Sequence, residues 1–430
     1  MVSKPPLLIA LSALACACAS ATPPPPTAVP SPPLAPEPSP TSTPAAPAGA
    51  PATPLRFIED DYARALAEAR VRALPLFIDT WAAWCHTCLS MRAYVLSDAL
   101  LAPFSSRFVF LSLDTERDDN APIVAKLGVR VLPTMFVMDP REEKVVFAWP
   151  GSMTAPELAA LLADASSTAA PSRWLDRDRV ADARVTKLAE TKQFPECVRA
   201  ASETAATMPA GTPLFDVLRA GLDCAASLPV GSPERATVQG LLTLAERAVS
   251  GTSTAVLADD RSDLYDYLVS ALRALDRGDE AKRVAADWAR FLEDEAARAP
   301  TPAARAVFDA HRLGAYLALG EPERAVPMLQ ESAHAFPDDY NPPARLAAAY
   351  LAMNRYDDAL AAVSRALAHA YGPRKLRFWS LEADILLAKG DRAGAKDALR
   401  RAIAFARTTP LTGSYPKLRD ALEKRLSEMP

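Results

Sequence analysis

The spacing of apolar residues in the C-terminal half constrains the fold of this chain more than any other feature. From Arg173 to Met429 the sequence is a succession of Ala- and Leu-rich helical segments separated by Gly, Pro and Asp turns. Small residues recur there with a period of roughly 34 residues, as Ala325, Ala359 and Ala395 illustrate. A helix pair cannot bury its apolar face alone, so neighbouring pairs must stack. The sequence therefore predicts an all-α solenoid.

Three units carry this pattern, with aromatic and small residues at similar offsets in each helix pair. Two further stretches, 185–209 and 263–297, look like degenerate units. The pattern resembles the tetratricopeptide repeat, and this resemblance implies a concave surface that binds a protein partner. The markers, unit by unit, are Tyr316, Gly320, Ala325 and Pro337; Leu346, Ala347, Tyr350, Tyr356, Ala359 and Ala366; and Trp379, Ala383, Gly390, Ala395 and Ala402.

A proline-rich tract precedes the globular part of the chain. Proline is by far the commonest residue from Thr22 to Pro54, and such a composition cannot build a core. We expect residues 19–54 to form an extended linker, which at ~3.1 Å per residue reaches up to roughly 100 Å. The predicted domains are then 55–168, with mixed strands and helices, and 173–430, with the helical repeats.

The segment 1–18 has the layout of a secretory signal. A positively charged start precedes the apolar run Leu7 to Ala15, which is too short to span a bilayer. The motif Ala13-Leu14-Ala15-Cys16 resembles a bacterial lipoprotein box, with Cys16 or the nearby Cys18 as the lipidated residue. Residues 19–21 suit ordinary signal cleavage instead, which would release a free periplasmic protein. We expect export to the bacterial periplasm or envelope, with membrane contact only through such an N-terminal lipid anchor.

Composition excludes other classes of protein. The net charge is −4 and half of the residues are apolar, whereas a nucleic-acid-binding protein needs a basic footprint. We therefore expect no nucleic-acid partner. No later segment approaches the ~20 uninterrupted apolar residues of a membrane-spanning helix.

Strand and helix patterns alternate between residues 55 and 168. This alternation predicts an α/β fold for the first domain. Strands are expected at 74–78, 108–113, 134–138 and 145–148, and helices at 59–72, from the cysteine motif through 95, at 123–127 and at 154–165.

The motif Cys85-His86-Thr87-Cys88 carries the chemistry. A zinc site would need a second pair of ligands, which Cys197, Cys224 and the distant histidines do not offer at suitable spacing. Covalent haem attachment would need His directly after the second cysteine, where this chain has Leu89. No metal or other cofactor is therefore expected. A redox-active dithiol and a fixed structural disulfide remain.

The surroundings of this motif resemble the thioredoxin family from about Leu55 to Ala165. The shared markers are Asp79, Trp81, Trp84, Pro133 and Gly151. The longer match from Cys85 to Met91, with 111–114 downstream, is most similar to the periplasmic C-terminal domains of thiol-disulfide interchange proteins. The resemblance implies a thioredoxin fold and a thiol-disulfide oxidoreductase that acts on protein thiols and disulfides and has an upstream redox partner.

Each cysteine has a distinct expected role. Cys85 would stand at the exposed N-terminus of a helix, where free N–H groups and the helix dipole lower the pKa of a thiol, and would be the attacking sulfur. Cys88, buried one turn later, would resolve the mixed disulfide. The resemblance implies that Asp79 moves protons to and from Cys88, whereas in the plainer alternative Asp79 only caps a turn.

Substrate contacts and redox poise follow from the same resemblance. It implies that Trp84, Leu132 and a cis Pro133 bind the substrate, while a trans turn proline is the alternative. Strong oxidants of this superfamily carry His directly before the second cysteine, where this chain has Thr87. His86 and Thr87 therefore favour a reductant or electron-transfer protein over an oxidant.

Two functions of different class remain in view. The first is a catalytic oxidoreductase whose repeats bind partners, and the second is a non-catalytic envelope adaptor in which the thioredoxin fold only docks. The other polar candidates have plain interpretations. Cys197 and Cys224 are more simply two small core residues than a disulfide, and His311, His334 and His369 are core or surface residues rather than ligands.

Overall fold

The computed structural model describes residues 55–165 and 177–429. The expected signal sequence with Cys16 and Cys18, and the linker 19–54, lie outside the described residues. The described residues belong to one compact unit, in which we distinguish a sheet region (55–165) and a helical region (177–429).

The sheet region is built on five strands in the order β1-β3-β2-β4-β5. The central strand β2 pairs in parallel with β3 and antiparallel with β4, and β5 closes one edge antiparallel to β4. Every residue of β3 is buried, because helices cover both faces of the sheet. The strands are β1 (Phe57–Glu59), β2 (Leu76–Trp81), β3 (Val109–Asp114), β4 (Thr134–Asp139) and β5 (Lys144–Pro150).

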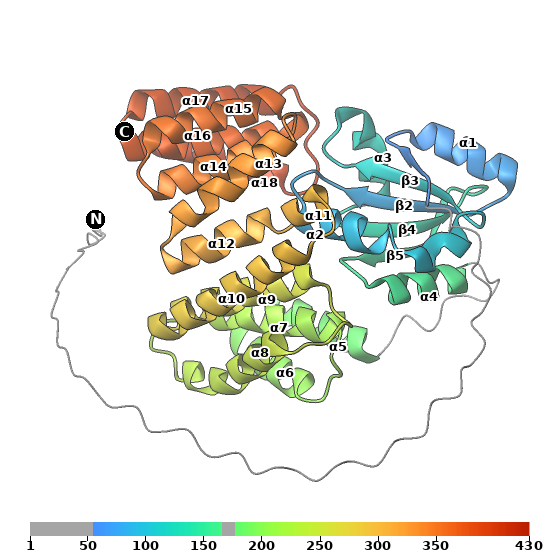
Figure 1. Ribbon diagram of the computed structural model, residues 1–430, viewed down its shortest axis with the longest axis horizontal. Helices are drawn as coiled ribbons and strands as arrows, with labels where there is room; N and C mark the ends of the chain where they lie inside the picture. The colour runs from blue at the N-terminus through green and yellow to red at the C-terminus, as the bar shows by residue number, and fades with distance from the viewer. Residues whose placement is uncertain (1–54, 166–176, 430) are drawn as a thin grey trace, which may run out of the picture. The chain divides into compact units, whose positions relative to one another are not determined.

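Helices cover both faces of this sheet (Figure 1), and an apolar cluster lies on each face. Phe77 of β2 faces the cluster that includes Met91 and Leu158, while Ile78 faces the cluster that includes Ala65 and Ile123. The helices that cover the faces are α1 (Tyr62–Arg72), α2 (His86–Ser90) with its π-helical continuation (Met91–Val95), α3 (Ala121–Leu127) and α4 (Ala155–Ala165). The α/β prediction is confirmed, and the predicted strands and helices lie within a few residues of those observed. The short strand β1 was not predicted.

The helical region is a stack of antiparallel helices, as the repeat spacing predicts. Ala325, Ala359 and Ala395, the small residues that define the period, are all fully buried. Its helices are α5 (Arg177–Glu190), α6 (Phe194–Ala205), α7 (Thr212–Ala226), α8 (Gln239–Ser250), α9 (Ala258–Ala274), α10 (Gly278–Arg298), α11 (Pro302–Ala306), α12 (Asp309–Leu319), α13 (Ala325–Ala335), α14 (Asn341–Ala352), α15 (Tyr356–His369), α16 (Lys375–Lys389), α17 (Arg392–Ala406) and α18 (Tyr415–Glu428).

One disulfide joins two neighbouring helices, α6 and α7, near the start of the helical region. Cys197 of α6 and Cys224 of α7 are both fully buried and are joined by an S–S bond. The preferred interpretation of these residues as two free core cysteines is therefore wrong, and the alternative of a bridge between neighbouring helices holds.

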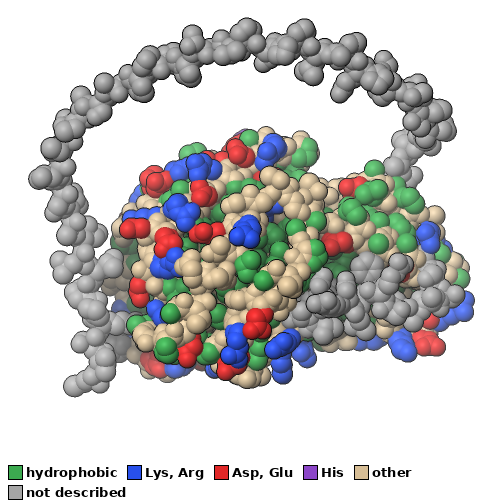
Figure 2. All heavy atoms as spheres, turned by 90° about the horizontal axis from the view of Figure 1, so that it is seen from below, with side chains coloured by type: hydrophobic (Ala, Val, Ile, Leu, Met, Phe, Trp, Pro, Cys, Tyr) green, Lys and Arg blue, Asp and Glu red, His purple; other side chains and the backbone are tan. Residues whose placement is uncertain are grey.

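The surface carries no dominant sign of charge on the face seen in Figure 2, where acidic and basic side chains are interspersed over the helices. Within 55–165 and 177–429, no helix combines the length and the hydropathy needed to cross a bilayer.

The two regions pack against each other around α2. This short helix contacts α9, and its continuation Met91–Val95 contacts α11 (Figure 1). Trp84 and Tyr94 of the sheet region join the main apolar cluster of the helical region. The end of the sheet that carries the cysteine motif therefore faces the helices.

Candidate functional site

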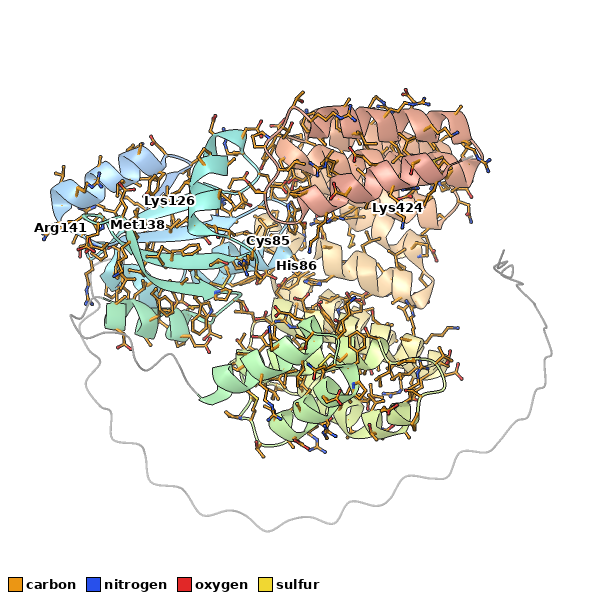
Figure 3. The ribbon with its side chains drawn as sticks, turned by 180° about the vertical axis from the view of Figure 1, so that it is seen from behind. Cys85, His86, Lys126, Met138, Arg141 and Lys424 are labelled. Carbon is orange, nitrogen blue, oxygen red and sulfur yellow. A yellow bond between two sulfur atoms is a disulfide. The ribbon has the colours of Figure 1, made fainter. Side chains whose placement is uncertain are left out.

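The two cysteines of the motif lie at the start of α2, directly after the central strand. Cys85 is the N-cap residue of this helix, and its Sγ accepts a hydrogen bond from the backbone N–H of Cys88 at 3.1 Å. The two sulfurs form a disulfide. Figure 3 shows Cys85 and His86 side by side where the sheet meets the helices.

The expectation that Cys85 is exposed is wrong. Cys85 retains 4% of its surface and Cys88 1%. Trp81, Trp84 and Leu132 pack around the pair, and the helical region covers this end of the sheet. In this arrangement a folded protein substrate cannot reach the Cys85 sulfur.

Asp79 lies on β2, the strand that leads to the motif, and is buried, as the sequence predicts. Its side chain is 2% exposed. Burial raises the pKa of Asp79 to about 6, against the opposing charge of Arg92. A carboxyl group with this pKa can both accept and release a proton near neutral pH, which fits the expected proton-transfer role better than a turn cap.

The peptide bond between Leu132 and Pro133 is cis, as the resemblance implies. The Pro133 carbonyl accepts a hydrogen bond from the Gly151 N–H at 2.8 Å, so the loop is tied to the end of β5. Leu132 contacts the cysteine pair. The structure therefore brings Cys85, Cys88, Leu132 and Trp84 together in one cluster.

Trp84 contacts residues of both the sheet region and the helical region. Its Nε1–H donates a hydrogen bond to Oε1 of Glu116 at 2.6 Å. The guanidinium of Arg374 lies 5.0 Å from the centre of its ring, within the range of a cation–π contact. Trp84, which we expected to contact substrate, therefore already contacts Glu116 and Arg374 of the same chain.

Polar contacts fasten the helical region over this face. Asn341 Nδ2 donates to the carbonyl oxygen of Ala83 at 2.9 Å, and Tyr94 Oη donates to that of Ala304 at 3.0 Å. Tyr415 donates to the buried Glu116 carboxylate.

Backbone shape contributes to the same contact. Gly372 has φ +51°, and a Cβ atom there would overlap the carbonyl oxygen of Glu116. Only glycine allows the two backbones to approach this closely. Beside it, Tyr371 donates a hydrogen bond to Asp114.

His86 directly follows Cys85, and its ring contacts a cluster of polar residues on the helical region. Its Nδ1 lies 3.1 Å from each carboxylate oxygen of Asp259, and its Nε2 lies 3.7 Å from Oδ1 of Asp263. Asp259 Oδ1 also pairs with Nε2 of His311 at 2.9 Å. The rings of His86 and His311 are 4.2 Å apart between centroids.

The charges in this cluster oppose the effect of burial. Burial alone would lower the pKa of His86, but the carboxylates of Asp259 and Asp263 outweigh it and raise the pKa to about 9. Burial alone would raise the pKa of Asp259, yet His86 and His311 hold it well below its usual range. The contact between His86 and Asp259 is therefore an ion pair at neutral pH.

The nitrogen and oxygen atoms of His86, Asp259 and His311 lie within 4.8 Å of one another, close enough to surround a metal ion. However, both ring nitrogens of His86 face carboxylates at hydrogen-bond or ion-pair distance. This arrangement is typical of a protonated imidazole, so we assign the cluster to ion pairing.

A narrow opening leads toward the cysteines from the other side. A cavity of about 120 Å³ is lined by Trp84, Leu132 and Tyr415. It adjoins a wider cleft of about 600 Å³ between residues 124–130 and 411–417. Because Trp84 and Leu132 also pack on Cys85, this opening borders the covered dithiol.

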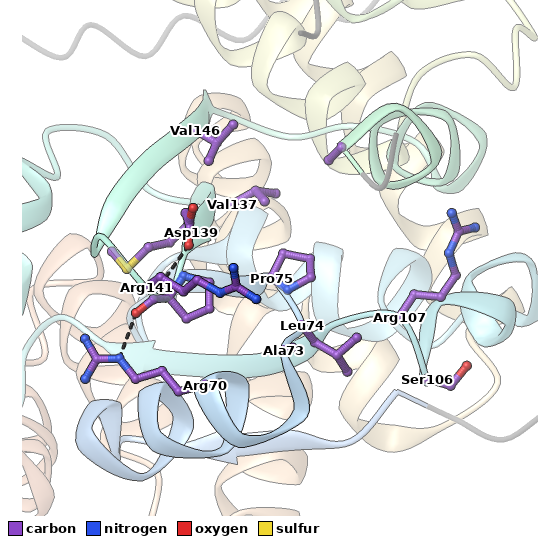
Figure 4. A pocket seen from close by; sticks show the side chains of 13 residues that line it. Arg70, Ala73, Leu74, Pro75, Ser106, Arg107, Val137, Asp139, Arg141 and Val146 are labelled. Carbon is purple, nitrogen blue, oxygen red and sulfur yellow. Dashed lines mark hydrogen bonds between the residues drawn. The ribbon is translucent and has the colours of Figure 1, made fainter. Parts of the chain in front are cut away.

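A further cavity, of about 530 Å³, lies at the opposite end of the sheet (Figure 4). Pro75, before the start of β2, lines it, whereas the cysteines follow the end of that strand. Arg70 at its edge donates to the carbonyl oxygen of Pro140 at 2.8 Å. The described residues that line this cavity include no cysteine or histidine, so it is not part of the redox site.

Sequence reasoning missed the residues that the helical region adds to the site. Asp259 resembles an ordinary acidic residue in the first turn of a helix, and Tyr415 lies 299 residues from its partner Glu116. His311 offered the one signal, a histidine within an apolar helical stretch. It is buried, as one plain interpretation had it, but its partner Asp259 was not foreseen.

The comparisons with known proteins agree with this geometry. A thioredoxin-like family model matches residues 57–140, and a tetratricopeptide-repeat model matches residues 316–385. A thioredoxin of Porphyra purpurea is 33% identical over 81 residues, which cover 18% of this chain and 72% of that protein. A thioredoxin of Haemophilus influenzae is 33% identical over 86 residues, covering 20% of this chain and 75% of that protein.

Among solved structures, a thermophilic tetratricopeptide-repeat protein of Thermus thermophilus is 20% identical, with a TM-score of 0.31, and the match covers 49% of this chain and 99% of that one. The two family models place the cysteine pair, cis-proline loop and buried acid in a thioredoxin-like segment, ahead of tetratricopeptide repeats that suggest protein–protein interactions. With the thioredoxins matched over most of their own length, the chain belongs to the thioredoxin family.

Proposed function

We propose that this protein is an exported thiol-disulfide oxidoreductase that acts as a reductant or electron carrier toward protein disulfides. The observation that carries the proposal is the arrangement of Cys85 and Cys88 at the N-terminus of α2, packed against Leu132 of the cis-proline loop and preceded on β2 by the buried Asp79. Thr87, rather than His, before the second cysteine supports the direction of electron flow.

The reaction transfers two electrons from the reduced dithiol. The Cys85 thiolate attacks one sulfur of the substrate disulfide, forming a mixed disulfide and releasing the other substrate sulfur as a thiol after protonation. Asp79 takes the proton from Cys88, whose thiolate attacks the Cys85 sulfur and releases the second substrate thiol. The product is the Cys85–Cys88 disulfide, which an upstream dithiol must reduce again.

The compartment is part of the proposal. The N-terminal sequence supports export to the bacterial periplasm or envelope, with Cys16 or Cys18 as a lipid anchor. The buried disulfide between Cys197 and Cys224 supports an oxidising compartment, where structural disulfides persist. Mass spectrometry of the mature N-terminus from envelope fractions tests both export and lipidation.

The helical region has two roles in this proposal. Its repeats bind a protein partner, and its contacts with Ala83, Glu116 and His86 close the redox site until that partner loosens them. Substrate then approaches beside Trp84 and Leu132, where the opening lies.

Reduction of insulin by the full-length protein, with dithiothreitol as electron donor, tests the proposal. We expect slow turnover by the wild type, limited by opening of the site, none by Cys85→Ser, and accumulation of a mixed disulfide by Cys88→Ser, because Cys88 releases the substrate. Capture of partners by Cys85→Ser but not by Cys88→Ser would reverse the two roles.

The second candidate, a non-catalytic adaptor, is favoured by one observation: the 4% exposure of Cys85. In an adaptor the Cys85–Cys88 bond would only stabilise the fold. Failure of every substrate and partner to become reduced, although the dithiol itself can be reduced chemically, would establish the adaptor and refute the oxidoreductase.

A further inference from the structure

The carboxylate of Asp259 lies in the first turn of α9 and is fully buried. It is the meeting point of two histidines from two other elements. His86 comes from the cysteine motif itself, and His311 comes from α12. The helical region thus places a buried negative charge against the residue that directly follows Cys85.

The pattern of contacts determines the protonation of His86. A neutral imidazole carries one N–H and one lone pair. Here Nδ1 faces both oxygens of Asp259 and Nε2 faces Asp263, so either neutral tautomer would direct a lone pair at a carboxylate. Only the doubly protonated ring offers a donor to each side.

The remaining groups around His86 do not change this balance. On α9, Asp266 lies one turn beyond Asp263 and adds negative charge. On α14, Arg345 is the opposing positive group. On its own helix, the hydroxyl of Thr87 lies 3.2 Å from Nδ1 and can accept a hydrogen bond from it.

His311 acts on Asp259 rather than on the cysteines. Its ring is 6% exposed, and its Nε2 lies 2.9 Å from Oδ1 of Asp259. A carboxylate held from one side by a buried ring has a fixed direction, and its two oxygens can then face His86 equally.

We propose that Asp259, oriented by His311, is a positioning residue of the redox site, which holds His86 as an imidazolium beside Cys85. The helical region then contributes residues to the redox site, in addition to covering it. Without Asp259, the imidazole would be largely neutral at pH 7, because the ordinary pKa of histidine is about 6.5.

This inference deepens the proposed oxidoreductase function in one respect. A cation fixed beside the attacking sulfur stabilises its thiolate. If His86 stays protonated in both redox states up to about pH 9, reduction of the disulfide draws no proton to this ring between pH 6 and pH 8.

The first test needs no enzymatic activity. The Cε1–H signal of His86 is followed by NMR during a pH titration of the oxidised, full-length protein, and it is assigned by its loss in His86→Asn. We expect a midpoint near 9 in the wild type and a midpoint near or below the ordinary value of about 6.5 in Asp259→Asn, because burial then outweighs the charge of Asp263. Asp338→Asn, which changes an exposed acid on the same region, should leave the midpoint unchanged.

Two results would overturn the inference. A wild-type midpoint near 6.5 would do so without any variant, even if Asp259→Asn failed to fold. An unchanged midpoint in a folded Asp259→Asn protein would show that other groups hold the proton.

The second test reads the redox couple itself. In Asp259→Asn the ring would be neutral in the disulfide form and would take up a proton only when the thiolate forms. The midpoint potential should therefore fall more steeply with pH between 6 and 9 than in the wild type. Equal slopes in the two proteins would refute the coupling to Cys85, whereas loss of insulin reduction with the NMR result intact would refute only the proposed function.

Discussion

Removal of one hydroxyl should open the covered redox site. Tyr415 donates a hydrogen bond to Oε1 of Glu116, the same oxygen that accepts from Trp84. Tyr415→Phe keeps the ring, which is 7% exposed, and deletes only this contact between the helical region and the sheet region.

The size of the effect follows from the kind of bond. A hydrogen bond to a charged group contributes about 1.5–3 kcal/mol. If the site must open before a large reductant reaches Cys85, and opening is fast compared with the reaction, the rate follows the opening equilibrium. The rate of reduction should then rise roughly 10- to 150-fold, since about 1.4 kcal/mol is a factor of ten.

The assay compares two reductants on the full-length protein. Reduction of the Cys85–Cys88 disulfide by a protein dithiol should show the full acceleration, while reduction by dithiothreitol, which can enter through a smaller opening, should show less. The control is Tyr356→Phe, because the hydroxyl of Tyr356 bonds to the nearby Asn354 rather than to the sheet region. Rates in Tyr415→Phe within twofold of those in the control would refute the closed-site interpretation.

Two further predictions concern buried groups. Because the pKa of Asp79 is raised from 3.8 to about 6, this carboxyl should make the protein less stable as pH rises from about 4 to about 6. In urea unfolding at pH 7, Asp79→Asn should therefore have a free energy of unfolding higher by roughly 2–3 kcal/mol than the wild type. The same variant should lose the increase of the reduction rate with pH near 6. An unchanged rate profile would reduce Asp79 to a structural residue. The Cys197–Cys224 disulfide closes a loop over a separation of 27 residues, so the double variant to Ala should lose about 3–4 kcal/mol by loop entropy, and a loss below about 1 kcal/mol in urea unfolding would contradict this.

Local patterns in the sequence predicted most of the sheet region. The apolar runs after residues 73 and 107 correspond to β2 and β3, because a strand buried on both faces reads as continuous apolar sequence. The strand β1 was missed, since its length is too small to show a pattern. In the helical region, the regular recurrence of small residues was sufficient to predict the stacked helices, because each repeat packs mainly on its neighbours.

The candidate site was predicted only as far as its residues lie close in sequence. Cys85 caps α2 and Asp79 is buried on β2, because both positions depend on one strand and one turn. The prediction that Cys85 is exposed was wrong because the residues that cover it come from α9 and the helices that follow it, far along the chain. Asp259 is 173 residues from His86, and no local signal marks a pair at that distance.

The distance between Glu116 and Tyr415 along the chain also bears on how the protein is made. Synthesis is vectorial, and N-terminal segments fold before later ones emerge. The cysteine pair is therefore synthesised well before α18, which supplies Tyr415. Until α18 is in place, the Cys85–Cys88 pair lacks part of the cover that it has in the folded protein, so a redox enzyme reaches Cys85 more easily before folding ends than afterwards.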